Sequence, residues 1–146
     1  MDAALKIEEV HGTSPRVLTA IRELVGQLSA SAQPPTPSEL DEIISSPACR
    51  LLICRDDDGR ILGMLTVVLF RIPTGVRAWI EDVVVDVSAR GQGLGSLLVR
   101  EAIAVARSAG ARTVDLTSRP DRDVANALYV REGFKLRETN LYRITL

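Results

Sequence analysis

The stretch Val85-Asp86-Val87-Ser88-Ala89-Arg90-Gly91-Gln92-Gly93-Leu94-Gly95 decides how this chain folds. The segment that leads into its glycines, from Ala78 to Val87, is rich in valine and isoleucine, as a strand covered on both faces tends to be. The residues after it are apolar at helical spacing. Backbone N–H groups at the start of a helix are unpaired and carry partial positive charge, and glycines let a phosphate approach them closely. The amides from Arg90 to Ser96, together with the Arg90 guanidinium, therefore predict a phosphate-binding turn.

Two other kinds of phosphate loop fit this turn less well. A Walker A loop needs a lysine before its hydroxyl residue, and Leu94-Gly95-Ser96 has none. A dinucleotide fingerprint is closer, because Gly91-Gln92-Gly93 is followed by Ser96 at the third place and by Asp115 near the acidic position. However, the turn follows three consecutive strands, and about fifty residues remain after it, which is too few for a doubly wound sheet. A Rossmann-type nucleotide protein stays the outside alternative.

Working outward, hydrophobic periodicity and turn residues predict elements along the whole chain. Before the turn we expect a strand at Lys6 to Val10, helices opening at Ser14-Pro15 and Thr36-Pro37-Ser38-Glu39, and strands at Arg50 to Arg55, Ile61 to Phe70 and Ala78 to Val87. After it we expect a helix ending before Gly110, a strand at Thr113 to Thr117, a helix at Asp121 to Glu132, and terminal strands at Phe134 to Leu136 and Leu141 to Ile144. Hairpins followed by a β-α-β crossover indicate a mixed α/β sheet with helices on both faces.

Composition limits the classes of function. The 146 residues fit one domain, residues 1–146, and a net charge of -1 gives no basic field for nucleic acid or for a membrane surface. No run of about 18 apolar residues occurs, and the stretch from Met1 to Val10 lacks the basic and apolar blocks of a signal peptide, so we expect neither a transmembrane helix nor a signal peptide. Cys49 and Cys54 are expected on opposite faces of a strand, unpaired, and His11 lies far from both in sequence, so we expect no metal and a cytoplasmic location.

Two motifs carry a resemblance to a known family. The quoted glycine-rich stretch is similar to the acetyl-CoA motif of the GNAT superfamily of N-acetyltransferases, Arg/Gln-x-x-Gly-x-Gly/Ala. Asn126-Ala127-Leu128-Tyr129-Val130-Arg131-Glu132-Gly133-Phe134 resembles the second marker of that family, Asn-x-x-Tyr-x-x-x-Gly-Phe. Both motifs occur in the family's order, in an element order that matches along nearly the whole chain.

The resemblance implies a mixed sheet in which the strand at Val83 to Val87 splays from its parallel neighbour. It also implies acetyl-CoA as co-substrate, with pyrophosphate held by the amides from Arg90 to Ser96. The segment Val83-Val84-Val85 would border the pantetheine arm, with the backbone groups of Val83 and Val85 pairing with it. Asn126 would lie near pantetheine, and Tyr129 beside the sulfur as the acid that protonates the departing thiolate.

The candidate base is Glu81 or Asp82, because two adjacent acids interrupt the apolar strand. Such a pair costs stability unless it is partnered or near water. The Glu-Asp pair resembles family members that act on amino sugars and polyamines, where the glutamate is assigned as base. We therefore expect Glu81 to act as the base, through a water molecule, with a solvated or ion-paired role as the structural alternative.

The acceptor is not identified by any motif. It would be selected by the first two helices, the loop from Ser29 to Pro37, and the turn from Arg71 to Arg77. A small amine is the favoured acceptor. A peptide or protein amine, and a non-catalytic module that binds or senses acyl-CoA, are the alternatives. The resemblance is also compatible with a homodimer formed through the late strands.

Overall fold

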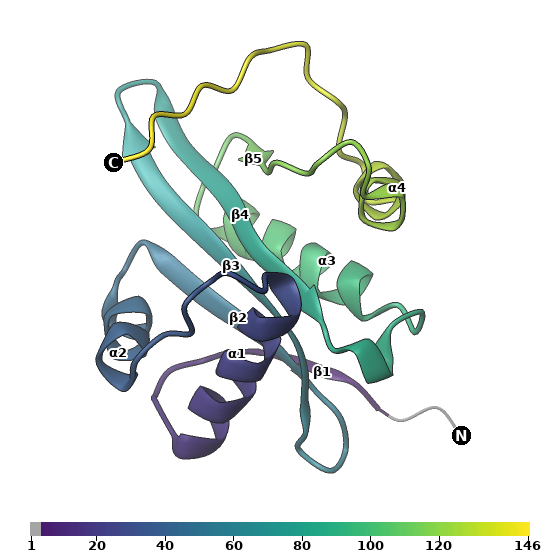
Figure 1. Ribbon diagram of the computed structural model, residues 1–146. Coiled ribbons are helices and arrows are strands. Elements are labelled where there is room, and N and C mark those ends of the chain that lie inside the picture. The colour runs from purple at the N-terminus through teal and green to yellow at the C-terminus, as the bar shows by residue number, and fades with distance from the viewer. Residues whose placement is uncertain (1–3) are drawn as a thin grey trace.

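The computed structural model describes residues 4–146 and contains a mixed five-stranded sheet. In spatial order the strands are β1 (Lys6–Glu9), β2 (Cys49–Arg55), β3 (Ile61–Ile72), β4 (Gly75–Val85) and β5 (Val114–Asp115), as Figure 1 shows. The first four are antiparallel, whereas β5 runs parallel to β4. The helices are α1 (Pro15–Leu28), α2 (Pro37–Ser45), α3 (Leu94–Ser108) and α4 (Asp123–Arg131), with a short 3-10 turn, η1 (Val87–Ala89), before α3.

The first two helices begin where the sequence predicts. The Ser14 hydroxyl accepts a hydrogen bond from the Val17 amide at 3.2 Å, and Pro15 follows at the first helical position. At the second helix, Thr36 and Glu39 form a reciprocal capping box in which each side chain accepts from the other residue's amide at 3.1 Å. These bonds satisfy amides that have no partner within the helix.

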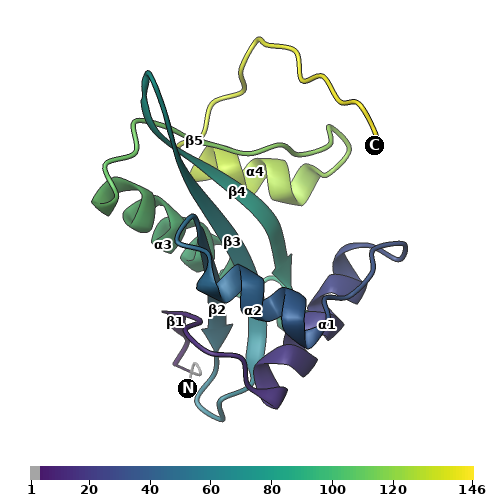
Figure 2. The same ribbon diagram turned by 90° about the vertical axis from the view of Figure 1, so that its left-hand side faces the viewer.

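Two apolar layers sandwich the sheet, and Figure 2 shows the helices on its opposite faces. One layer joins α1 and α2 to residues such as Leu51, Ile53 and Met64, while the other joins α3 to Leu52 and Leu65. Successive residues of β2 therefore enter different layers, as strand geometry requires. The two cysteines are free, and the buried Cys54 lies in the α3 layer. In the part of the chain that the structure describes, no helix is long and apolar enough to cross a membrane.

The parallel pair β4–β5 is short and then opens. Only Ala78 with Val114 and Trp79 with Asp115 are paired, so the second half of β4 has no neighbour on that side. The predicted splayed pair is thus confirmed, although the expected strand Thr113 to Thr117 is reduced to two residues.

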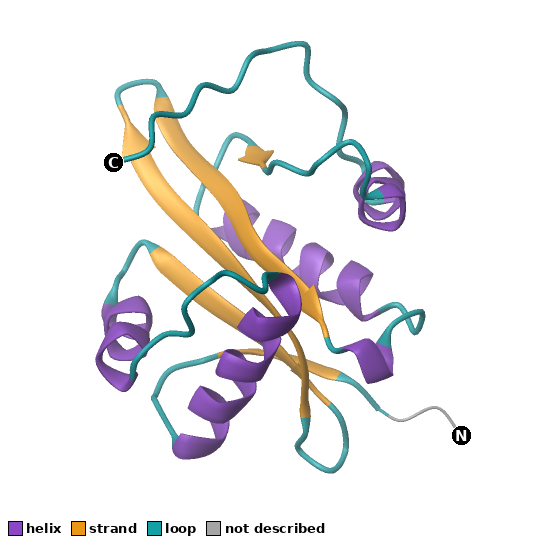
Figure 3. Ribbon diagram, viewed as in Figure 1, coloured by secondary structure: helices purple, strands orange, loops and turns teal. Residues whose placement is uncertain are grey.

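The two predicted terminal strands, Phe134 to Leu136 and Leu141 to Ile144, are wrong. Residues 132–146 contain no strand, and Figure 3 draws this tail as an extended loop. The Phe134 amide donates to the Tyr129 carbonyl at 2.9 Å, which holds the start of the tail to α4. The chain then runs away from β5, and a strand cannot form without a partner for its backbone. The alternating apolar side chains of the tail therefore do not pack against the sheet as the side chains of a strand would.

Candidate active site

The glycine-rich turn forms an open cradle at the start of α3. Gly91 and Gly93 have φ values of +80° and +83°, a left-handed conformation that favours glycine. Apart from the glycine and its two chain neighbours, no heavy atom of the described residues lies within 4 Å of the position that a Cβ would occupy at either residue. Gly93 is the N-cap of α3 and supplies no side-chain capping bond. The unpaired amides of the first turn can therefore receive an anion, as the sequence predicts.

A β-bulge in β4 reshapes the strand just before this turn. Thr66 pairs with Glu81 and Met64 with Val84, so two residues of β4 stand opposite Leu65 alone. Asp82 has φ +51° and is the one residue other than glycine with positive φ among the described residues. Aspartate tolerates this conformation better than most side chains, yet it remains costly. After the bulge, each residue of β4 therefore points its side chain to the opposite face, and its backbone groups to the opposite edge, from those that regular alternation would give.

Past the bulge, the backbone of Val83 and Val85 faces the gap beside β5. The Asp86 amide donates to the Leu62 carbonyl at 2.8 Å, and Val84 pairs with Met64, so alternate residues 84 and 86 face β3. Consistent with this, the outward carbonyl of Val85 accepts from Arg90 Nε at 3.2 Å. Val84 lies on the closed edge, and its side chain is buried against α1 and α2. The geometry thus offers Val83 and Val85 to a ligand in the gap, but not Val84.

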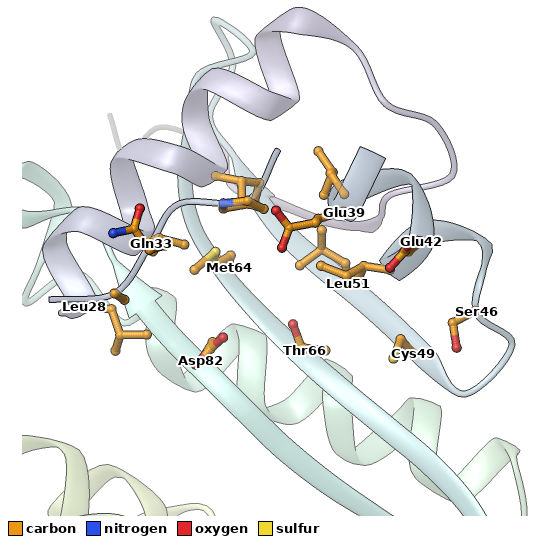
Figure 4. Close-up of a pocket in the computed structure, with 16 residues that line it drawn as sticks. Leu28, Gln33, Glu39, Glu42, Ser46, Cys49, Leu51, Met64, Thr66 and Asp82 are labelled. Atoms are coloured by element: carbon orange, nitrogen blue, oxygen red, sulfur yellow. The ribbon is translucent and has the colours of Figure 1, made fainter. Parts of the chain in front are cut away.

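On the other face of the sheet, a cavity of about 480 Å³ lies among α1, α2, the loop that joins them, and strands β2 to β4. We call this cavity the acceptor pocket, after the acceptor walls expected from the sequence. Figure 4 shows Asp82 and Thr66 on its sheet side, with Gln33, Glu39 and Glu42 on the side of the loop and α2. We expected from the sequence that α1, α2 and the loop between them would select the acceptor, and residues of all three line this cavity. The Arg71-to-Arg77 turn does not line this cavity.

Asp82, and not Glu81, lines the acceptor pocket. Its side chain is open to solvent at the pocket, and desolvation by the surrounding atoms, followed by the charge of Glu81, raises its pKa. Glu81 is exposed, and its carboxylate accepts a hydrogen bond from the indole Nε1 of Trp79 at 2.7 Å. The structure therefore brings Asp82 to the pocket and leaves Glu81 outside its lining, while the identity of the base stays a prediction.

Helix α4 carries the second motif and packs over the start of α3. A Cβ on Gly95 would lie 3.5 Å from Leu128, so the small residue permits this close approach. Tyr129 is 7% exposed, meets the Phe134 ring edge-on with centroids 6.0 Å apart, and has its pKa raised by burial. The Asn126 amide donates to the Arg119 carbonyl at 2.9 Å, which fixes the loop before α4. Asn126 therefore has a structural role here, and its role near pantetheine stays a prediction.

Gln27, near the end of α1, connects the helix beside the pocket to the segment that precedes the glycine-rich turn. Its side chain donates to Asp86 at 3.0 Å and accepts from the Val87 amide at 2.9 Å. Hydrogen bonds from the Ser88 hydroxyl and then from Gln27 lower the pKa of Asp86 to about 2. The helix that walls the acceptor pocket is thereby fixed to the residue that precedes the glycine turn.

Sequence reasoning missed Gln33, Glu39 and Glu42 as pocket residues. The capping box identified Glu39 as a helix-start residue, and nothing in the pattern revealed that the same face of α2 would overlook Asp82. No group of three or more histidine, cysteine or acidic side chains suited to a metal ion occurs among residues 4–146.

The open glycine cradle at the start of α3 suits a phosphate group that lies beside the gap between β4 and β5. The family model described as "Acetyltransferase (GNAT) family" matches residues 18–134. The chain belongs to this family and is an acetyl-CoA-dependent GNAT N-acetyltransferase.

Individual relatives agree with the family assignment. The chain is 32% identical over 131 residues to a glucosamine 6-phosphate N-acetyltransferase of Trypanosoma brucei brucei, covering 85% of this chain and 86% of the relative. A crystal structure of a Trypanosoma brucei acetyltransferase superposes with a TM-score of 0.79 at 28% identity, over 98% of this chain and all of that one. The aminoglycoside N-acetyltransferase AAC(6')-Iy in complex with CoA shares the fold, with a TM-score of 0.83 at 16% identity over 99% and 97% of the two chains.

The raised pKa of Asp82 predicts a pH-dependent stability difference for Asp82→Asn. In the folded protein the ionised form of Asp82 is disfavoured, so its charge costs stability once the pH exceeds the unfolded pKa of about 4. The variant should therefore be more stable than the wild type at about pH 7 and lose this advantage at about pH 3. Urea unfolding at both pH values measures the difference. Glu101→Gln, an exposed carboxylate on α3, is the control, and an advantage that grows on acidification would contradict the assignment.

Proposed function

We propose that this enzyme transfers the acetyl group of acetyl-CoA to a small amine by direct attack, with Asp82 as the general base and Tyr129 as the general acid. The observation that carries the proposal is Asp82 itself, which is held at positive φ by a bulge and lines a pocket on the sheet opposite the splayed gap. Residues kept in costly backbone conformations concentrate at functional sites. The relative from Trypanosoma brucei brucei, named for a small amine acceptor, supports a small acceptor here.

In the proposed reaction, the donor lies in the gap beside β4 and its pyrophosphate at the amides of Arg90 to Ser96. Glycine conformation, open space above Gly91 and Gly93, and the uncapped start of α3 support this placement. Val83 and Val85 present backbone groups to the pantetheine arm. At the Val85 carbonyl, the arm displaces the Arg90 guanidinium, which donates to this oxygen in the free protein. Asn126 lies on the α4 face that borders this arm.

Asp82 accepts the proton that the amine must lose, directly or through a water molecule. The free lone pair then attacks the thioester carbonyl carbon, and the new C–N bond gives a tetrahedral oxyanion. The C–S bond breaks as the carbonyl re-forms, and the departing thiolate takes the proton of the Tyr129 hydroxyl. The acylated nitrogen still carries one proton more than an amide, and this proton returns to the Tyr129 phenolate through solvent. Because burial raises the pKa of Tyr129, this hydroxyl is still protonated at neutral pH and can act as the acid.

A thiol-release assay with acetyl-CoA and a panel of amines tests the proposal and separates the two bases. Asp82→Asn should lower kcat/KM by roughly 10² to 10³-fold near neutral pH. The deficit should shrink as the pH rises, because the amine then loses its proton to solvent. Glu81→Gln should stay within about threefold of wild type, as expected for a surface group outside the pocket.

The reverse pattern, with Glu81→Gln inactive and Asp82→Asn active, would make Glu81 the base, as the resemblance suggested. Tight binding of acetyl-CoA without transfer to any amine would favour the non-catalytic module. Higher kcat/KM for peptides than for small amines would identify a peptide acceptor.

Removing one hydroxyl tests the acid. Tyr129→Phe retains the ring that packs against Phe134 and should lower kcat by roughly 10- to 100-fold, because the thiolate leaves without a proton donor. The chain supplies a matched control in Tyr142→Phe, since the Tyr142 side chain is exposed on the tail. Initial rates at saturating substrate measure kcat, and an unchanged kcat for Tyr129→Phe would exclude Tyr129 as the acid.

We also propose a homodimer formed through the tail. Its support is the exposure of large apolar side chains between 136 and 146, namely Leu136, Leu141, Tyr142, Ile144 and Leu146. The edge of β5 away from β4 is also unpaired in the described chain, and both an open strand edge and exposed apolar surface favour association with a second copy.

Light scattering after size exclusion should give twice the chain mass of 15.9 kDa for the wild type. The double variant Leu141→Asp, Ile144→Asp should be monomeric, while Val124→Asp, on the exposed face of α4, should leave the mass unchanged. A wild-type monomer at concentrations of roughly 100 μM would refute the dimer, since specific interfaces of standard size bind far more tightly.

A further inference from the structure

The charged groups that line the acceptor pocket are all acidic. Glu39 and Glu42 from α2 and Asp82 from β4 line it, and its lining contains no lysine, arginine or histidine. The neutral polar groups are Gln33, Ser46 and Thr66, and the rest of the lining is largely apolar. The nearby Arg22 guanidinium is exposed and donates to the Pro35 carbonyl at 2.6 Å, without itself lining the cavity.

The two glutamates act as a pair because of their spacing. Residues three apart lie on the same face of a helix, so Glu39 and Glu42 overlook the cavity together, as Figure 4 shows. Hydrogen bonds from the backbone and then the side chain of Thr36 lower the pKa of Glu39, which keeps this carboxylate ionised. One Glu39 oxygen accepts from the Thr36 amide, which leaves the carboxylate able to bind a further donor.

This charge pattern distinguishes between classes of acceptor. A phosphomonoester brings about two negative charges, which three carboxylates would repel and no lining cation would offset. A second ammonium group would instead pair with Glu39 and Glu42 while the reacting amine lies at Asp82. The apolar lining between them, including Leu51 and Met64, suits the hydrocarbon part of such a molecule.

We propose that the acceptor is a non-phosphorylated amine that carries a second positive charge, and that Glu39 and Glu42 determine this specificity. This inference rests on the proposed function, and it separates the chain from the relative that is named for glucosamine 6-phosphate. A pocket of this charge selects by favouring the dication and rejecting the phosphorylated competitor at the same time.

The test measures kcat and KM by thiol release for matched acceptors. Putrescine and spermidine should exceed butylamine in kcat/KM by about tenfold or more, as one charge-assisted contact provides. Glucosamine should exceed glucosamine 6-phosphate by at least about tenfold. Glu39→Gln and Glu42→Gln should each raise the KM for the diamines about threefold with little change in kcat, whereas Glu101→Gln on α3 should change neither.

The substitutions are chosen so that the fold survives. Glutamine can still accept the Thr36 amide bond, so Glu39→Gln removes charge without removing the capping box. Glu42→Lys should shift the selectivity toward glucosamine 6-phosphate by improving its kcat/KM relative to glucosamine, a gain that misfolding cannot produce.

Different results would contradict this inference and the proposed function. Transfer that favours glucosamine 6-phosphate in the wild type, or diamine KM values unchanged in both glutamine variants, would overturn this inference and leave the proposed function standing. Binding of acetyl-CoA without thiol release for any of these amines would overturn the proposed function, and this inference with it.

Discussion

The bulge in β4 opposite Leu65 is the constraint from which both halves of the site follow. One extra residue in the strand exchanges the faces of what comes after it: Ile80 lies in the α3 layer, and Val84 lies against α1 and α2. The same residue places Asp82 on the acceptor side and gives the outer edge to Val83 and Val85. A regular strand would have kept strict alternation, and Asp82 would then have shared a face with Ile80. The positive φ of Asp82 is the local cost of this arrangement.

The donor side depends on a second constraint, the close approach of α4 to the start of α3. Gly95 has no side chain to hold Leu128 away, and Arg100 of α3 binds Glu132 through both carboxylate oxygens, at 2.8 and 3.1 Å. Tyr129 is the buried residue of α4 and reaches into the α3 layer. The motif residues Gly95 and Tyr129 thus help to set the distance between two helices as well as carrying predicted chemical roles.

Most of the fold could be predicted, because its signals are local. Proline after a cap residue, glycines that need positive φ, and apolar periodicity placed the helices, the hairpins and the crossover within a few residues. Two features were beyond such signals. The tail from 134 to 146 has the alternation of a strand, but alternation cannot show whether a partner edge will be present. The bulge is a property of two strands in register, so Glu81 and Asp82 could not be separated by reading one of them. The sequence also indicated α1, α2 and their loop as the wall of the acceptor pocket but did not single out Glu42, because the face that α2 turns toward the sheet depends on tertiary packing.

The capping box at α2 has a consequence for how this enzyme can change through evolution. Glu39 has two positions to fill, since it completes the start of a helix and lines the pocket. Replacing it with a residue that cannot accept the Thr36 amide would cost on the order of 1 kcal/mol of stability as well as a charge in the pocket. Glu42 lines the same cavity without belonging to the capping box. Under the proposed role of the two glutamates, a change of acceptor preference costs least stability at Glu42, and descendants of this sequence should diverge there while Glu39 persists or is replaced by glutamine.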